Sequence, residues 1–288
     1  MAAKSLLGRM RSVAIKYLNS VYELLDLQRE LVIFQETESW RRAIQQGRYS
    51  DPKRLLGYGY KVFSESDEDG LITEIFRRIG VESRTFFEFG VGDGLANNTL
   101  NLLIGGWRGF WIDGSSAFVK QIEASLGQYI KTGQLQVLNS FITVGNINKL
   151  IGQLGIPKSI DLLSIDIDGN DYWIWEAIEA VSPRVVVIEY NATLHPPHSL
   201  VMEYREDNQW NGTNYFGASL CALETLGRKK GYSLVCCNYT GVNAFFVRND
   251  LVEDRFFGPF TAGTHYEPAR YLKLKSGHPV GIGPYREV

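Results

Sequence analysis

A run of glycines joins two strongly apolar segments between residues 85 and 115, and it limits the local structure more than any other stretch. The first apolar segment, residues 86–89, leads into Gly90, Gly92 and Gly94, and the second ends on Asp113. Glycines two positions apart let the backbone turn sharply and approach a neighbouring group, because no Cβ intervenes. The stretch therefore predicts a strand, a glycine turn, a helix and a second strand with an acidic tip.

Helical and strand-like segments keep alternating after this stretch. We predict helices over 117–130, 147–154, 172–181 and 217–231, and strands over 135–142, 160–168, 184–190, 232–239 and 244–248. Strands that are apolar along their whole length are typical of parallel strands buried on both faces by helices. The last two strands are expected to form an antiparallel pair. The chain is therefore predicted to be an α/β protein with a doubly wound sheet.

The remaining segments flank or interrupt this core. Residues 1–60 are predicted to form a helical extension, 61–250 the main domain with an insertion at 192–217, and 251–288 an irregular tail packed on it. Apolar side chains at helical spacing over residues 4–35 predict a helix with one broad apolar side. Its expected role is homo-oligomerisation or packing within the chain or, because its first half is basic, contact with a membrane surface.

Charge and composition exclude several classes of protein. The formal net charge of -2 predicts no broad basic surface for a nucleic acid. Cys221, Cys236 and Cys237 fit neither a disulfide framework nor the paired spacing of a zinc site. The sequence contains no run of about 18 apolar residues, the length typical of a membrane-spanning helix. We expect a cytoplasmic protein with reduced thiols.

Asp113 gives the first indication of a ligand. An acidic side chain at the tip of the strand after a glycine turn can accept hydrogen bonds from both hydroxyls of a ribose. A nucleoside-containing cofactor is therefore expected beside it. The glycines run G-x-G-x-G, whereas the fingerprint of dinucleotide-binding proteins is G-x-G-x-x-G, so the spacing disfavours a nicotinamide cofactor.

Together with the acid that precedes it, the glycine run resembles motif I of the class I S-adenosylmethionine-dependent methyltransferases, E/D-x-G-x-G-x-G. The matching residues are Glu88-Phe-Gly-Val-Gly-Asp-Gly94. The resemblance implies a seven-stranded Rossmann-like sheet with an antiparallel last strand, and S-adenosylmethionine as cofactor. It places Gly90, Gly92 and Gly94 beside the methionine part of the cofactor and Asp113 on its ribose. The remaining candidate cofactor-binding residues are Glu88, Ser140 and Asp166.

Polar side chains gather at the ends of two predicted strands. Asp166 and Asp168 end one strand, and Glu189 and Asn191 end the next. Ligands of open α/β sheets bind at the carboxyl ends of the strands, so these four groups are expected on one rim. Acids held together repel each other unless a proton, a cation or a substrate hydroxyl separates them. Asp168, Glu189 and Asn191 are thus candidate ligands of a divalent metal such as Mg²⁺.

The insertion at 192–217 shows no clear periodicity and is rich in polar and aromatic residues. A long loop that follows a strand of the cofactor rim is typically a lid or a substrate loop. Trp210 and Tyr215 offer flat faces for a sugar ring, and with Asn191 they are the candidate substrate-binding residues. His195, four residues beyond Asn191, is a candidate general base near neutral pH.

The second half of the chain resembles a narrower group, the FkbM-like sugar methyltransferases. Residues 160–169, IDLLSIDIDG, are similar to the motif after the fourth strand of that group, usually D-x-E-G, and residues 241–248 to its closing hairpin strand. Asp168 stands where glutamate is usual, which shortens the side chain by one methylene. The resemblance spans residues 62–249 and implies a sugar, a glycan or a glycan precursor as acceptor.

An acidic segment precedes the first strand. Ser66 is placed to cap a helix that runs to Ile79, with Asp67, Glu68 and Asp69 in its first turn. The alternative interpretation is a loop that closes over the ammonium or sulfonium group of the cofactor.

These features predict an enzyme that transfers the methyl group of S-adenosylmethionine to a hydroxyl of a sugar or glycan. Asp166, Asp168 and His195 are the candidate catalytic residues, and we favour direct deprotonation over a metal because no histidine-rich spacing requires one. The alternatives are a nicotinamide-dependent oxidoreductase and a non-catalytic protein of glycan assembly that keeps the cofactor fold.

Overall fold

The computed structural model describes residues 47–270 and 278–288 without a gap, together with residues 20, 21, 24, 25, 27, 28, 31, 35, 38–42, 44 and 45. The chain divides into two compact units, Met1–Ser50 and Asp51–Val288. The boundary falls before the predicted one at residue 60 because residues 51–60 are bound to the second unit. Arg78 donates to the backbone oxygens of Pro52 and Lys53, and Gly70 N donates to that of Tyr60.

In the first unit, the described residues from 20 to 42 are helical, and a short 3-10 helix, η1, spans Gly47–Tyr49. The side chains of Leu24, Leu25, Leu27 and Leu31 are exposed. Most of the helix predicted over 4–35 lies outside the described residues, so its role in oligomerisation or membrane contact stays a prediction.

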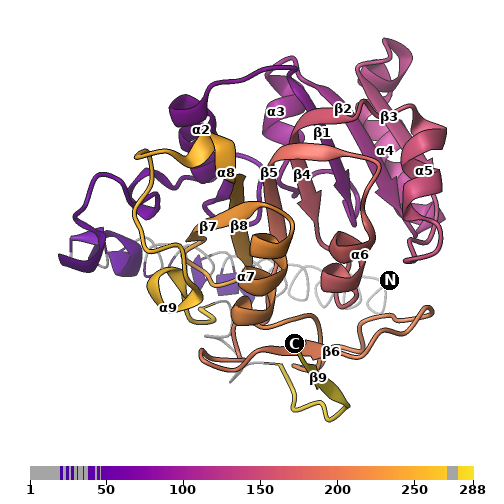
Figure 1. The fold of residues 1–288 in the computed structure, drawn as a ribbon. Coiled ribbons are helices and arrows are strands. Elements are labelled where there is room, and N and C mark those ends of the chain that lie inside the picture. The colour runs from indigo at the N-terminus through magenta and orange to yellow at the C-terminus, as the bar shows by residue number, and fades with distance from the viewer. Residues whose placement is uncertain are drawn as a thin grey trace, which may run out of the picture. The chain divides into compact units, whose positions relative to one another are not determined.

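A seven-stranded sheet forms the centre of the second unit (Figure 1). Its order is β3-β2-β1-β4-β5-β8-β7. The strands are β1 (Thr85–Phe89), β2 (Arg108–Asp113), β3 (Leu135–Asn139), β4 (Ser159–Ile165), β5 (Ser182–Glu189), β7 (Tyr232–Cys237) and β8 (Asn243–Arg248). β1 to β5 are mutually parallel, and β8 is antiparallel to both of its neighbours. The predicted doubly wound sheet with an antiparallel last strand is confirmed.

Helices cover both faces of this sheet. They are α2 (Glu68–Ile79), α3 (Leu100–Ile104), α4 (Ser116–Lys131), α5 (Ile147–Leu154), α6 (Asp171–Ala177) and α7 (Leu220–Lys229). Phe87 and Phe89 of β1 belong to one buried cluster with apolar residues of α5, α6 and α7. The β1 and β2 side chains Phe86 and Trp111, which alternate with these, are buried outside that cluster. Figure 1 shows α6 and α7 in front of the sheet and α3 behind it.

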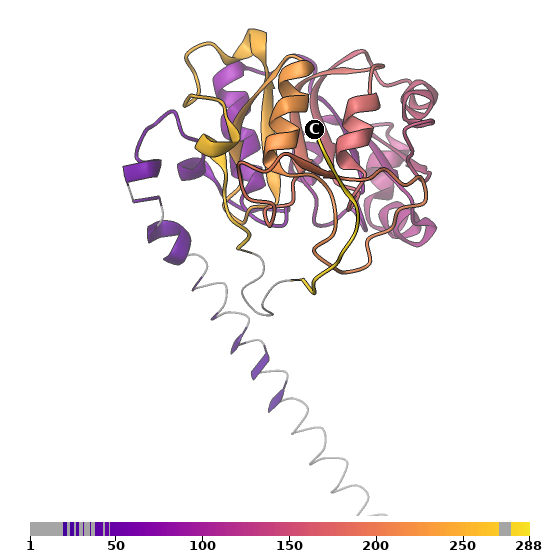
Figure 2. The same cartoon turned by 60° about the horizontal axis from the view of Figure 1, so that its bottom comes forward.

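The insertion and the C-terminal tail are tied together by a second, two-stranded sheet. β6 (Leu200–Met202) lies in the insertion, which was predicted to be irregular, and pairs antiparallel with β9 (Tyr285–Glu287) near the end of the chain. Figures 1 and 2 show the C-terminal segment running along the insertion. The tail also contains α8 (Asn249–Val252) and α9 (Ala262–His265), and a 3-10 helix, η2, spans Leu56–Tyr58. Among the described residues no helix is both long and apolar enough to cross a membrane.

The helix predicted to run to Ile79 is confirmed as α2, with Glu68 and Asp69 in its first turn, but Ser66 does not cap it. Asp67, not Ser66, is the N-cap of α2, and it makes no side-chain cap hydrogen bond. Asp69 Oδ2 instead accepts from the backbone N–H groups of residues 62, 63 and 64 at 2.7–2.9 Å. Glu68 Oε1 accepts from Asn238 and Asn243, at 2.7 and 3.1 Å. Asp69 therefore holds the loop at residues 62–64 to the start of α2, and Glu68 ties α2 to the residue after β7 and to β8.

Gly90 is where β1 meets the residue that follows β4. Its φ is +76°, and a Cβ at this position would lie 1.5 Å from the backbone oxygen of Asp166. The backbone continues the pairing of β1 with β4, since Asp166 N donates to Phe89 O at 3.3 Å. The ends of the two strands can approach this closely only because residue 90 has no side chain.

This contact predicts that Gly90→Ala is far more destabilising than Gly92→Ala. Gly92 also has a positive φ, +57°, but a Cβ there meets nothing within 4 Å. Gly92→Ala should cost about 1–2 kcal/mol from the left-handed backbone alone, and Gly90→Ala at least about 2 kcal/mol more from overpacking. Denaturant unfolding of the two variants checks this, and equal losses would contradict the contact.

Candidate functional site

A pocket of about 450 Å³ lies at the carboxyl ends of β1, β2 and β4. Seven residues predicted from the sequence line it: Gly90, Gly92, Asp113, Ser140, Asp166, Asp168 and Trp210. Its other lining residues include Phe118, Phe141, Asn170, Asn208 and Gln209. One pocket thus brings together the predicted cofactor turn, the acids after β4 and part of the insertion.

Asp113 and the glycine turn hold each other in place. Asp113 Oδ2 accepts from Gly92 N at 2.9 Å, and Oδ1 accepts from Ser115 N at 2.7 Å. Burial raises the pKa of this carboxyl group, although the two hydrogen bonds oppose the shift. Each carboxylate oxygen can accept a further hydrogen bond. The side chain is therefore oriented by the chain and keeps acceptor capacity toward the pocket that it lines.

Gly94 and Glu88, two of the predicted cofactor residues, do not line the pocket. A Cβ on Gly94 would lie 2.9 Å from the Trp111 ring, so this glycine permits packing. Glu88 is 3% exposed, and its oxygens accept from Asn98 N, Thr99 Oγ1 and Ser164 Oγ. Glu88 therefore fixes the segment between the glycine turn and α3 and ties it to β4, a role that the sequence did not reveal because Ser164 lies 76 residues away.

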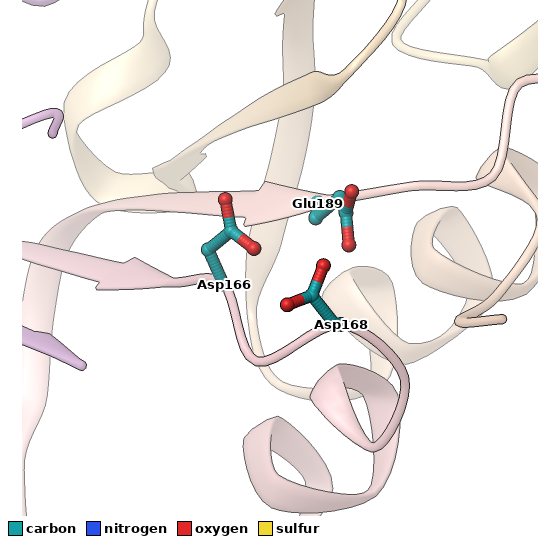
Figure 3. Close-up of side chains that lie close together, drawn as sticks. All are labelled: Asp166, Asp168 and Glu189. Atoms are coloured by element: carbon teal, nitrogen blue, oxygen red, sulfur yellow. The ribbon is translucent and has the colours of Figure 1, made fainter. Parts of the chain in front are cut away.

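Three carboxylates form a compact group next to the pocket (Figure 3). One oxygen each of Asp166, Asp168 and Glu189 lies within 4.8 Å of the others. Asp166 and Asp168 follow β4, Glu189 ends β5, and the figure shows the three side chains converging. Burial, followed by the charges of the neighbouring acids, raises the pKa of Asp166 and of Glu189 well above the usual range. Burial also raises the pKa of Asp168, and His278 opposes that shift.

Glu189 has one unsatisfied atom. Its Oε2 is buried and has no hydrogen-bond partner among the described residues. A buried carboxylate oxygen without a donor is costly, because it has lost water and gained nothing in return. A proton or a bound cation would remove this cost.

Asp171 shapes the turn that carries Asp166 and Asp168. Its two oxygens accept from Ile167 N and Gly169 N, each at 2.8 Å. Asp168 between them has a φ of +56°, a left-handed conformation that costs energy for a residue with a side chain. Such outliers persist where the surroundings enforce them, often at functional sites. In the sequence, Asp171 belongs to the polar cluster that follows β4 but has no predicted role of its own.

The structure does not place Asn191 among the acids, contrary to its prediction as a metal ligand and substrate-binding residue. Its Nδ2 donates to the backbone oxygens of Asn214 and Phe216, both at 2.9 Å. Its Oδ1 accepts from Thr193 N and Thr193 Oγ1. The Asn191 side chain is fully buried, and its hydrogen bonds join the start of the insertion to its end.

His195 and Tyr215 also lie outside the lining of the pocket. His195 Nδ1 is 3.1 Å from Tyr266 Oη in the tail, which donates to Ala192 O. Tyr215 Oη donates to Pro284 O at 2.7 Å, and its ring packs against Tyr285. Both side chains fasten the insertion to the tail. The predicted catalytic role of His195 rested on its closeness to Asn191 along the chain, and the substrate-binding role of Tyr215 rested on its flat ring. Neither argument shows where the folded insertion places the side chain.

Trp210 reaches the pocket with support from the tail. Its Nε1 donates to Thr213 O at 2.8 Å, and its ring contacts His278 edge-on with centroids 4.9 Å apart. Asn208 and Gln209 line the pocket beside it. His278 was missed in the sequence because it lies more than 100 residues beyond Asp168, the acid whose pKa it affects.

Comparisons with known proteins give only distant similarity. Neither a family model nor a curated protein matches the chain. Among solved structures, it is similar to an S-adenosylmethionine-dependent methyltransferase from Clostridium acetobutylicum, with a TM-score of 0.37 and 12% identity over 62% of this chain and 89% of that one. For a precorrin-6y C5,15-methyltransferase from Geobacter metallireducens the TM-score is 0.38 and the identity is 11%, over 66% of this chain and 92% of that one. For an O-methyltransferase family protein from Burkholderia thailandensis the TM-score is 0.38 and the identity is 9%, over 63% of this chain and 57% of that one. Such values assign no activity to the chain.

The buried Glu88 predicts a specific dependence of stability on pH. Burial raises its pKa from 4.5 to about 7, against the opposing hydrogen bonds. The folded state therefore holds this proton more tightly than the unfolded state, and stability should fall as the pH rises from 4.5 to 7. The loss is on the order of 3 kcal/mol at 1.36 kcal/mol per pKa unit.

Glu88→Gln should remove this part of the pH dependence, because glutamine does not titrate. Glu123→Gln, at an exposed position of α4, is the matched control and should follow the wild type. Chemical unfolding at pH 5 and pH 7.5 measures the difference. If the wild type and Glu88→Gln lose the same stability between these pH values, the account of Glu88 is wrong.

Proposed function

We propose that this protein transfers the methyl group of S-adenosylmethionine to a hydroxyl oxygen of a sugar or glycan. The observation that carries the proposal is the composition of one pocket. The pocket is lined both by Gly90, Gly92 and Asp113 and by Asp166 and Asp168. Groups suited to a nucleoside and groups suited to proton transfer therefore face the same space.

The proposed cofactor position follows from the chemistry of the lining. Asp113 accepts hydrogen bonds from the ribose hydroxyls, as acids at the second strand tip of such sheets do. Phe118 and Phe141 line the pocket and are 42% and 44% exposed, so their rings can enclose the adenine. The glycine turn leaves room for the methionine part, because it presents backbone instead of side chains.

The proposed reaction is a direct displacement. The acceptor oxygen attacks the methyl carbon, the carbon–sulfur bond breaks, and its electron pair stays on sulfur to give S-adenosylhomocysteine. Asp168 takes the hydroxyl proton, since it is exposed to the pocket and its raised pKa brings it nearer to neutral pH. Most of the rate comes from holding the oxygen, carbon and sulfur in line.

The proposed acceptor side consists of Trp210, Asn208 and Gln209. The Trp210 ring offers an apolar face to a sugar ring, and the two amides offer both donors and acceptors to its hydroxyls. All three residues line the pocket together with Asp168. A sugar hydroxyl held by this group would lie beside the proposed base.

Asp166, Asp168 and Glu189 also fit a divalent cation such as Mg²⁺, which prefers oxygen ligands. The unpartnered Oε2 of Glu189 supports this version, because a cation would satisfy it. A bound cation would lower the pKa of an acceptor hydroxyl. In this version the three carboxylates hold the ion as anions instead of retaining protons.

The cofactor assignment predicts binding of S-adenosylmethionine without binding of NAD. Asp113→Ala should weaken the affinity for S-adenosylmethionine at least 10-fold, because it removes the ribose acceptors at a cost of about 1.4 kcal/mol or more. Asp207→Ala, at an exposed position of the insertion, should bind as the wild type does. Isothermal calorimetry decides this, and heat with NAD but none with S-adenosylmethionine would overturn the proposal.

The cation version predicts that Mn²⁺, used as a probe for Mg²⁺, raises the unfolding temperature. The effect should grow from pH 6 to pH 8, because the cation must displace protons from carboxyl groups whose pKa is raised. Glu189→Gln should lose the effect, and Glu206→Gln, an exposed acid of the insertion, should keep it. No stabilisation of the wild type by Mn²⁺ would leave direct deprotonation by Asp168 as the mechanism.

A further inference from the structure

A second pocket, of about 720 Å³, lies beside the first and has no role in the proposed methyl transfer. Its wall is built from four segments that are far apart in the chain, one of which contributes Val144, after β3. Trp173 and Glu176 come from α6, Glu203 and Tyr204 follow β6, and Tyr285 and Arg286 come from β9. The pocket therefore exists only because the last strand of the chain pairs with the insertion.

The aromatic floor of this pocket is held in a fixed orientation. Trp173 Nε1 donates to Met202 O at 2.8 Å, which leaves the ring half-buried. Tyr204 Oη accepts from Val144 N at 3.2 Å. The Arg286 guanidinium carbon lies 5.8 Å from the centroid of the Trp173 ring. Trp173, fixed by its own hydrogen bond, and Arg286, which lies over its ring, together form one aromatic and cationic wall against which a ring-shaped ligand can pack.

The charges around the floor select the kind of ligand. Glu176 and Glu203 face Arg286 across the same lining, and Glu176 also pairs with Lys229 Nζ at 3.2 Å, so the wall favours neither an anion nor a cation. An apolar chain would have to desolvate these charged groups. A neutral ligand with many hydroxyls does not meet this obstacle. Its apolar ring faces can lie on aromatic rings, while carboxylate and guanidinium groups accept from and donate to its hydroxyls.

Two chain segments, the one after β3 and the insertion, contribute residues to both pockets. Phe141 and Ile142 line the first pocket and Val144 lines the second. In the insertion, Glu203 and Tyr204 line the second pocket and residues 208–210 line the first. Asn170 of the first pocket also donates to Arg205 O at 2.7 Å, so the segment between them is bound to the rim. A ligand longer than one sugar can span this short wall.

We propose that the second pocket is a carbohydrate subsite that binds sugar units of an extended acceptor at a distance from the methylated unit. The proposal rests on the proposed function for its link to methyl transfer, but sugar binding itself needs no cofactor. In this proposal the C-terminal strand β9 takes part in ligand binding, because it supplies Tyr285 and Arg286. It also predicts that the acceptor is an oligosaccharide or polysaccharide rather than a free monosaccharide.

Saturation-transfer NMR without S-adenosylmethionine tests the subsite. The probes are malto-, cello-, xylo- and chito-hexaose, each with its monosaccharide. The wild type should bind at least one hexaose at least 10-fold more tightly than the matching monosaccharide. Arg286→Ala and Glu203→Gln should each weaken that binding at least fivefold. Glu287→Ala, an exposed neighbour on β9 outside the pocket lining, should bind as the wild type does.

Two results would overturn the subsite: no hexaose binds the wild type, or Arg286→Ala and Glu203→Gln bind as the wild type does. Calorimetry with S-adenosylmethionine on the same variants separates this outcome from failure of the proposed function. Both variants should bind S-adenosylmethionine with wild-type affinity, since neither residue lines the first pocket. Hexaose binding without S-adenosylmethionine binding would keep the subsite and remove the methyl transfer.

Discussion

The candidate site depends on the approach of Gly90 to the backbone oxygen of Asp166. A Cβ at residue 90 would lie 1.5 Å from that oxygen, so the ends of β1 and β4 can meet only at a glycine. From this contact the glycine turn runs toward Asp113, and the chain after β4 runs toward Asp168. Glu88 fixes the segment that follows the glycine turn, and Asp171 shapes the turn that follows β4. The two sides of the pocket are thus set by one backbone contact and two buried carboxylates.

Acids at the two ends of β4 show how the environment separates structural from chemical roles. At the amino end, burial of Asp161 is outweighed by hydrogen bonds from Arg184 and from backbone N–H groups, so its pKa is lowered. At the carboxyl end, burial and neighbouring acids raise the pKa of Asp166, which follows β4, and of Glu189, which ends the adjacent strand β5. The first arrangement stabilises a fixed charge, whereas the second favours the uptake of a proton or a cation. Strongly perturbed groups of the second kind gather at functional sites.

Much of the fold could be predicted from the sequence, because the period of the apolar residues reports which segments are buried and in which conformation. The helix predicted over 147–154 matches α5, and the glycine turn, Asp113 and the acids after β4 all lie at one sheet edge. The roles of Asn191, His195 and Tyr215 were predicted less well, because their partners come from distant parts of the chain. The pairing of β6 with β9 was not predicted for the same reason, since 82 residues of chain separate Met202 from Tyr285. The spacing of apolar residues indicates which side chains are buried, but it does not show which distant residues they contact.

The most direct test of the account is a crystal structure of the protein with S-adenosylhomocysteine. We expect the ribose hydroxyls to donate hydrogen bonds to Asp113 and the adenine to lie between Phe118 and Phe141. The sulfur should point toward Asp166 and Asp168. Well-defined density for the ligand elsewhere, or a first pocket that stays empty at saturating ligand, would contradict methyl transfer at this site.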